Sequence, residues 1–308
     1  MGVLSDLRDP TSRLAKILSG LLGLLLFSVI FVSAISGVLI YQILRPTRTS
    51  TKFDLNVMMG HPTTFSFTAN GLSRDGWFFP GLRAAPTVVV CHGYHSQRAD
   101  VLTLVSALQD HGFNVFTFDF SGHGSSAGVT TLGYRETEEL RSAVDALGKR
   151  DDVDHRRFGL WGADMGGYAV MEVAESDQRI AAFVVDDAYA DPRDMVQLQV
   201  NHSGLAALPF VSRFSDLEFR VLNYSFRNQP AVPVRLWKTA GIPKLFIQSE
   251  DRPELAGDTG KMYAAAPDPK QTASNSMSYF DMSDDDRRNY ESLTVNFFLK
   301  NIPPVPAR

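Results

Sequence analysis

From Thr87 onward, short apolar runs alternate with amphipathic stretches, and this alternation restricts the chain to few folds. Each run has the length of a strand and is apolar on both faces, as strands of parallel sheets are. The stretches between the runs carry apolar residues at the spacing of one helix face. Alternating strands and helices predict an α/β fold, a mostly parallel sheet covered by helices on both faces. The predicted strands are Thr64–Thr68, Thr87–Cys91, Val115–Phe118, Phe158–Trp161, Ala181–Val185 and Lys244–Gln248, and Tyr290–Leu299 is predicted to be a closing helix.

An uncharged apolar segment, Ile17–Leu44, precedes this domain. It is longer than the roughly 20 residues that a helix needs to cross the hydrocarbon core of a bilayer. Lys16 and Arg45 flank it, as basic residues flank membrane spans. A cleaved signal peptide is the alternative, because Val32-Ser33-Ala34 is similar to a cleavage site. Since apolar residues continue past Ala34, we favour an uncleaved single-pass transmembrane helix whose partner is the lipid bilayer.

The apolar segment divides the chain into four parts. These are an N-terminal tail (1–16), the transmembrane helix (17–44), a polar linker (45–52) and one large domain (53–308). Basic residues are balanced on the two sides of the helix, which leaves the orientation open under the positive-inside rule. A domain outside the cytoplasm is the favoured prediction. Gly71 and Gly76 are predicted to lie in turns near the start of the domain.

Composition argues against several classes of ligand. The net charge of −4 gives no indication of a basic surface for nucleic acid. The sequence has no phosphate-binding or dinucleotide glycine motif, so no cofactor is predicted. The aspartates around Asp186-Asp187 are not predicted to bind a metal ion, because this pair ends a predicted strand.

The alternation of strands and helices breaks between Pro192 and Gly241, where the chain is helical in tendency and rich in phenylalanine. Ligands of open α/β sheets bind beyond the carboxyl ends of the strands. We therefore interpret this segment (about 192–241) as a helical lid over that edge. An ordinary pair of core helices is the alternative.

The loops after the predicted strands carry motifs whose order and spacing agree with one superfamily. Gly162-Ala163-Asp164-Met165-Gly166-Gly167 stands between a strand and a helix, with small residues where a tight turn needs them. The other motifs are His92-Gly93-Tyr94, Phe118-Asp119-Phe120-Ser121-Gly122-His123-Gly124-Ser125 and Gly133-Tyr134-Arg135-Glu136. Together they resemble the α/β-hydrolase superfamily, particularly its bacterial serine aminopeptidase-like (S33-type) and esterase-like members. The resemblance extends from about Ser66 to Ala190.

This resemblance implies an α/β-hydrolase fold and a family activity of ester or peptide hydrolysis. It places Asp164 at the nucleophile elbow, where hydrolases of this fold usually carry a serine. It implies that the backbone amides of Tyr94 and Met165 form the oxyanion hole. The residues that it implies to be structural in these loops are His92, Gly93, Gly162 and Gly166.

The chain departs from the superfamily at each catalytic position. Where the relatives carry an acid after the strand equivalent to Lys244–Gln248, this chain has Arg252, with Glu250 and Asp251 nearby as possible acids. The relatives carry a histidine shortly before the last helix, whereas the last histidine here is His202. Without a base, a nucleophile of this kind is not activated. We therefore interpret the chain as a catalytically degenerate member that acts in binding or scaffolding at the membrane.

Two enzymatic alternatives remain open. In the first, Asp164 acts with Glu250 or Asp251 as the acid and a displaced histidine such as His202 as the base. In the second, Asp164 attacks an alkyl carbon, as an aspartate does in haloalkane dehalogenases and epoxide hydrolases, but the chain lacks that family's base. An imidazole within hydrogen-bonding reach of Asp164 would favour an enzyme. At a helix N-terminus and beside two amides, Asp164 is predicted to be ionised, with its carboxylate competing for the oxyanion hole.

Overall fold

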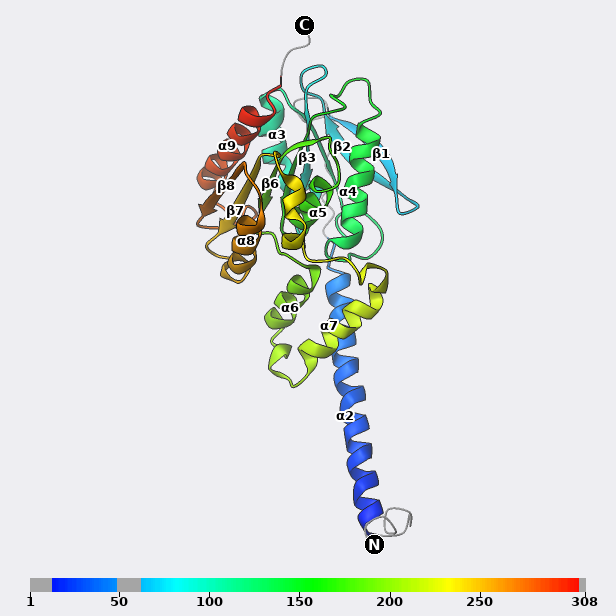
Figure 1. The fold of residues 1–308 in the computed structure, drawn as a ribbon. Coiled ribbons are helices and arrows are strands. Elements are labelled where there is room, and N and C mark those ends of the chain that lie inside the picture. Colours follow the sequence, from blue (N-terminus) through cyan, green and yellow to red (C-terminus); the bar gives the residue numbers. More distant parts are fainter. Residues whose placement is uncertain (1–12, 49–61, 305–308) are drawn as a thin grey trace. The chain divides into compact units, whose positions relative to one another are not determined.

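Eight strands form one sheet in the computed structural model, which describes residues 13–48 and 62–304 (Figure 1). The strand order is β1-β2-β4-β3-β5-β6-β7-β8. The pairs β1–β2 and β2–β4 are antiparallel, and every other pair is parallel. The strands are β1 (Thr63–Ala69), β2 (Leu72–Phe79), β3 (Thr87–Cys91), β4 (Asn114–Phe118), β5 (Phe158–Ala163), β6 (Ile180–Asp186), β7 (Lys244–Ser249) and β8 (Lys270–Asn275).

Helices cover both faces of this sheet. α3 (Leu102–Asp110) and α9 (Asp284–Asn301) pack together on one face, and α4 (Tyr134–Leu147) and α5 (Asp164–Ala174) pack together on the other (Figure 1). α8 (Pro253–Ala265) packs against β7. All residues of β3 and β4 are buried, as they must be in strands covered on both faces. The predicted α/β-hydrolase fold with a mostly parallel sheet is confirmed.

The six predicted strands are present with ends that differ by two residues at most, but β2 and β8 are additional. Gly71 lies in the predicted turn, with a φ of 74°. The prediction that Gly76 lies in a turn is wrong, because Gly76 is inside β2 and pairs with Phe65 and Phe118. A Cβ atom at Gly76 would collide with the ring of Phe116, so the glycine makes room for that ring.

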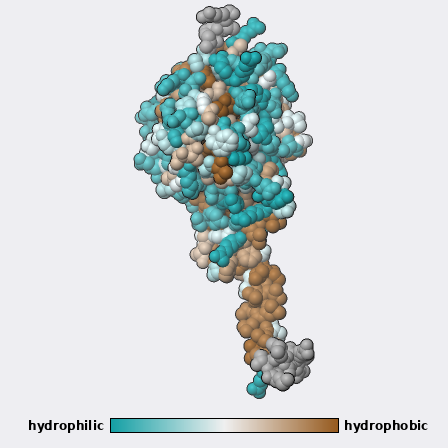
Figure 2. All heavy atoms as spheres, in the orientation of Figure 1, coloured by the Kyte–Doolittle hydropathy of each residue, from teal (hydrophilic) through white to brown (hydrophobic). Residues whose placement is uncertain are grey.

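The N-terminal helix α2 (Arg13–Leu44) and residues Val196–Tyr224 form a second compact unit. α2 begins before the predicted start at Ile17 and is long and apolar enough to cross a membrane, a test that a signal sequence near an N-terminus also passes. Its side chains are exposed from Ile17 to Phe31, and Figure 2 shows them as a continuous apolar surface. Residues 1–12 of the predicted tail, 49–52 of the linker and 53–61 of the domain lie outside the described residues.

The segment predicted to be a lid is helical. It contains α6 (Pro192–His202), α7 (Val211–Leu222) and 3-10 turns at Leu205–Ala207, Tyr224–Phe226, Val232–Val234 and Leu236–Thr239. Its middle, Val196–Tyr224, belongs to the unit that contains α2, whereas its two ends belong to the unit of the sheet. Its placement over the edge of the sheet stays a prediction.

A buried ion pair joins β2 to α4. The guanidinium of Arg74 lies 2.8 Å from the carboxylate of Glu139, and neither side chain is more than 2% exposed. Arg74 also donates to the backbone oxygen of Ala127 at 3.1 Å. Removing one partner of such a pair leaves the other charge buried without compensation, which typically costs about 3–5 kcal/mol.

We therefore expect Arg74→Met to lower the free energy of unfolding by about 3–5 kcal/mol. The matched control is Arg141→Met, which breaks the pair with Glu138, whose side chains are 35% and 47% exposed, and should cost about 1 kcal/mol or less. Urea unfolding of the full chain in detergent measures both. Arg74→Met/Glu139→Leu should recover part of the loss. Equal costs for the two single variants would contradict this description of the pair.

Candidate functional site

The tight turn between β5 and α5 holds Asp164 at the carboxyl edge of the sheet. Asp164 has a φ of 34°, which is strained for a residue with a side chain. A Cβ atom at Gly162 would collide with the backbone of Gly166. One at Gly166 would lie 2.6 Å from the backbone oxygen of Cys91. Both glycines are therefore required for the close approach of helix and strand that fixes this turn.

The carboxylate of Asp164 occupies the position of the predicted oxyanion hole. Its Oδ1 atom accepts a hydrogen bond from the amide of Tyr94 at 2.6 Å and another from the amide of Met165. These are the two amides that the resemblance assigns to the hole. A Cβ atom at Gly93 would lie 2.6 Å from Asp164 Oδ2, so the carboxylate fits because this position is glycine. Both amide donors are thus hydrogen-bonded to a side chain of the protein itself.

Burial of Asp164 governs its ionisation. The side chain is 4% exposed. Burial raises its pKa above the ordinary value, and the amides of Met165 and Tyr94 and the charge of Arg252 act in the opposite direction. The net shift is upward, so the carboxyl group keeps its proton to a higher pH than an exposed aspartate does. The prediction of an ionised Asp164 rested on the two amides and the helix N-terminus. It left out the cost of burying the charge, which raises the pKa.

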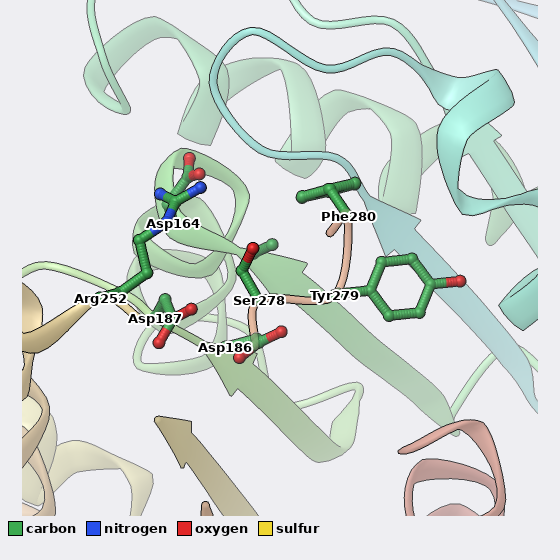
Figure 3. A pocket seen from close by; sticks show the side chains of 8 residues that line it. Asp164, Asp186, Asp187, Arg252, Ser278, Tyr279 and Phe280 are labelled. Atoms are coloured by element: carbon green, nitrogen blue, oxygen red, sulfur yellow. The ribbon is translucent and has the colours of Figure 1, made fainter. Parts of the chain in front are cut away.

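Two further carboxyl groups lie beside Asp164, at the end of β6 (Figure 3). Asp187 accepts a hydrogen bond from the amide of Ser249 at 2.7 Å, and burial raises its pKa to about 6. Asp186 is buried and accepts a hydrogen bond from the hydroxyl of Tyr290 at 2.9 Å. Burial and the neighbouring charge of Asp187 raise the pKa of Asp186 well above its ordinary value. Three carboxyl groups therefore line one small space.

That space is a cavity of about 10 Å³, which holds about one water molecule. A second cavity, of about 440 Å³, has the size of a small-molecule site. Arg252 and Phe280 line both cavities. The other residues that line the larger one are Tyr94, His95, Ser96, Asp100, Asp281 and Arg287.

Arg252 is the cation of the site. It precedes α8, at the position where the resemblance predicts an acid, and its charge partly offsets the upward pKa shifts of Asp164, Asp186 and Asp187. Figure 3 shows its side chain extending toward Asp164. Within residues 13–48 and 62–304, its guanidinium forms no ion pair.

Ser278, Tyr279 and Phe280 line the small cavity, in the segment where the resemblance predicts a catalytic histidine. The ring of Tyr279 points away from Asp164 (Figure 3). Its hydroxyl lies 2.9 Å from the hydroxyl of Thr103 and 3.2 Å from the carboxylate of Glu291. None of the three side chains can act as the missing imidazole.

The histidines near the site are held in other interactions. His92 Nδ1 lies 2.7 Å from the backbone oxygen of Gly93, and His92 Nε2 accepts from the amide of Phe120, so both ring nitrogens are used. Burial lowers the pKa of His92 and lowers that of His123 to about 3, so both are neutral. His95 is exposed to the larger cavity. In the part of the chain that the structure describes, no hydrogen bond joins an imidazole to Asp164.

The other predicted site residues are not brought to Asp164 by the described geometry. Glu250 and Asp251 are exposed and line neither cavity. His202 ends α6, within the unit that contains α2. The carboxyl groups that do lie beside Asp164 are those of Asp186 and Asp187, which the sequence analysis assigned to the end of a strand. The adjacency of β5 and β6 could have indicated them, since the carboxyl ends of neighbouring parallel strands meet at one edge.

Comparison with known proteins identifies the family to which the chain belongs. Residues 88–296, more than half of the chain, match the family model described as "Alpha/beta hydrolase family". An uncharacterized 31.7 kDa protein of Escherichia coli, from the traX-finO intergenic region, is 33% identical over 125 residues. That match covers 40% of this chain and 44% of the relative, so the chain spans less than half of the relative's length.

Two solved structures show the same fold. The esterase Pf2001 of Pyrococcus furiosus superposes with a TM-score of 0.66 at 19% identity, over 84% of this chain and 98% of that one. The alpha/beta hydrolase GrgF of Penicillium superposes with a TM-score of 0.60 at 18% identity, over 78% and 99% of the two chains. At such identities the likeness shows the fold alone.

The raised pKa of Asp187 predicts how stability depends on pH. Because burial moves this pKa from 3.8 to about 6, the folded protein retains a proton that the unfolded chain releases between these values. The ionisation of Asp187 therefore opposes folding, and stability is lost as the pH rises from about 4 to about 6. At about 1.4 kcal/mol per pKa unit, the loss is up to about 3 kcal/mol at neutral pH.

Asp187→Asn keeps an acceptor for the amide of Ser249 but cannot ionise. Its free energy of unfolding should therefore fall less than that of the wild type between about pH 4 and pH 7. Urea unfolding at both pH values measures the difference. An equal fall in the two proteins would show that Asp187 does not carry this dependence.

Proposed function

This chain belongs to the alpha/beta hydrolase family, and we propose that it is a catalytically degenerate member that binds a ligand without hydrolysing it while α2 anchors it in a membrane. The observation that carries this proposal is the pair of hydrogen bonds from the amides of Tyr94 and Met165 to Asp164 Oδ1. In acyl transfer, these donors must receive the substrate's carbonyl oxygen as it becomes negative. Here they are already occupied.

A nucleophilic role for Asp164 meets two chemical obstacles. Attack of a carboxylate on an ester or amide releases the alcohol or amine and produces an anhydride, which is more reactive than the bond that it replaces, so this step is energetically uphill. Turnover then requires a base that activates water. The groups around the small cavity are carboxyl groups, Arg252 and the side chains of Ser278–Phe280, and none of them is an imidazole. This composition supports binding over turnover.

The larger cavity is the proposed ligand site. Its two acidic side chains are engaged: Asp100 accepts from Ser96 at 2.9 Å, and Asp281 accepts from Ser278 at 2.8 Å. Among the described residues, Arg252 forms no ion pair, so its donors stay available to a ligand, and Arg287 adds a second positive charge to the lining. Guanidinium groups suit carboxylates and similar planar anions. The proposed ligand is therefore a small molecule with an anionic group.

Activity measurements test this proposal directly. Serine-directed fluorophosphonate probes should not label the full-length protein, because no activated serine stands at the elbow. A broad screen of esters and peptides should give the same background for the wild type and for Asp164→Ala. Robust hydrolysis by the wild type that is lost in Asp164→Ala would overturn the proposal and favour a rearranged hydrolase.

Restoring the missing groups provides a matched series. Asp164→Ser alone should gain little turnover, because no base removes the hydroxyl proton. Phe280→His places an imidazole in the segment that lines the small cavity, and Arg252→Asp supplies an acid to orient it. The triple variant should exceed Asp164→Ser by about 100-fold or more in ester hydrolysis, as expected for a general base. High activity of Asp164→Ser alone would reveal a base elsewhere.

The membrane anchor is the second part of the proposal. It is supported by the length and apolar surface of α2 and by the exposure of its side chains from Ile17 to Phe31. Full-length protein should stay in the membrane pellet after a wash in alkaline carbonate, and its N-terminus should precede Ile17. Mature protein that begins after Ala34 would instead identify a cleaved signal peptide. The location of the hydrolase domain outside the cytoplasm stays a prediction.

A further inference from the structure

The side chains of α7 fall on three faces, because successive residues turn by about 100° around a helix. One face is buried and consists of Val211, Ser215 and Phe219. A polar face consists of Ser212, Arg213, Asp216 and Arg220. The third face, here called the apolar face of α7, consists of Phe214, Leu217 and Val221, and Phe210 directly precedes the helix.

The apolar face of α7 is largely exposed. Leu217 and Val221 are 56% and 64% exposed, and Phe214 is half-buried. Phe210 and Tyr224, which flank the helix, are 60% and 62% exposed. Large apolar side chains grouped on one helix face, beside a second face with arginines, are typical of helices that lie in the interface of a membrane. The pattern alone does not identify the partner, so the position of α7 along α2 matters.

Glu218 fixes that position within the unit that α2 and α7 share. Ser33 of α2 donates a hydrogen bond to the carboxylate of Glu218 at 2.9 Å. One turn further along α2, a Cβ atom at Gly37 would lie 3.8 Å from the same carboxylate, so the backbone is close. α7 therefore meets α2 at the level of residues 33–37.

This level coincides with the expected boundary of the hydrocarbon core. A span that starts at Ile17, directly after Lys16, reaches Ser36 after the roughly 20 residues that a bilayer requires. The exposure of α2 changes near the same place, since every side chain from Ile17 to Phe31 is exposed, whereas further along buried residues such as Ser36 and Ile40 alternate with exposed ones such as Val38. A bilayer around α2 would thus end where α7 begins.

We infer that α7 lies in the interface of the lipid bilayer, with its apolar face against the acyl chains and Arg213 and Arg220 near the headgroups. The inference rests on the proposed membrane anchor. The partner is lipid because α2 brings a bilayer to the level of Glu218, and because the apolar face belongs to the same unit as that span. The anchor then consists of one spanning helix and one helix that lies on the membrane.

Quenching by brominated lipids tests this arrangement in the full-length protein. Val221→Cys, with Leu217→Cys as a second reporter of the same face, carries an environment-sensitive fluorophore in vesicles of phosphatidylcholine and phosphatidylglycerol. Ser212→Cys on the polar face of α7 is the matched control, and Leu24→Cys reports the span. Cys91 is buried, and unsubstituted protein measures any label on it.

Lipids brominated near the headgroup end of their chains should reduce the fluorescence at Val221→Cys and Leu217→Cys and leave Ser212→Cys unchanged. Lipids brominated near the chain ends should quench Leu24→Cys most. Quenching at Leu24→Cys without quenching at either reporter would overturn the inference and leave the anchor in place. Equal quenching of Val221→Cys and Ser212→Cys would overturn the assigned face. Absence of quenching at all four positions would overturn the anchor and the inference together.

Discussion

The contact between one carboxylate and two backbone amides determines what this site can do. The elbow directs Asp164 toward the sheet edge because Gly162 and Gly166 permit the turn, and Gly93 leaves room for the carboxylate. Asp164 Oδ1 accepts hydrogen bonds from the amides of Tyr94 and Met165. Under the proposed function, these amides are the donors of an oxyanion hole, and the carboxylate takes the position that a substrate's carbonyl oxygen would need.

Around this contact, the site is a cluster of buried acids with one cation, Arg252, nearby. Asp164, Asp186 and Asp187 share a cavity with room for about one water molecule, and Arg252 is the positive charge that faces them. Desolvation raises the pKa of each carboxyl group, so their charge depends on pH in a range where most aspartates are fully ionised. A catalytic triad divides its roles among a nucleophile, a base and an acid, and this cluster contains only acids and an arginine.

The alternation of apolar runs predicted most of the sheet because the strands concerned are buried on both faces. β2 and β8 were not predicted, for two different reasons. Gly76 suggested a turn, although it lies inside β2 to make room for the ring of Phe116. β8 (Lys270–Asn275) is a largely polar edge strand without an apolar run. The elbow and the two amide donors followed from the resemblance to a known superfamily, which rests on local motifs. The proximity of Asp187 and the exposure of Glu250 did not, because they depend on how β6 and the loop after β7 meet in space. The upward pKa shift of Asp164 depends on burial, which no local motif records.

The chain passes between its two units three times, after Ile43, after Met195 and after Tyr224. A protease that cuts only between α2 and β1 would therefore not shed the enzyme-like domain, since Val196–Tyr224 remains part of the same polypeptide and packs with α2. A chain truncated before β1 would keep Val196–Tyr224 but lack α2, the helix with which that segment forms a unit. α2 is therefore part of a compact unit that is built from two segments far apart in the sequence.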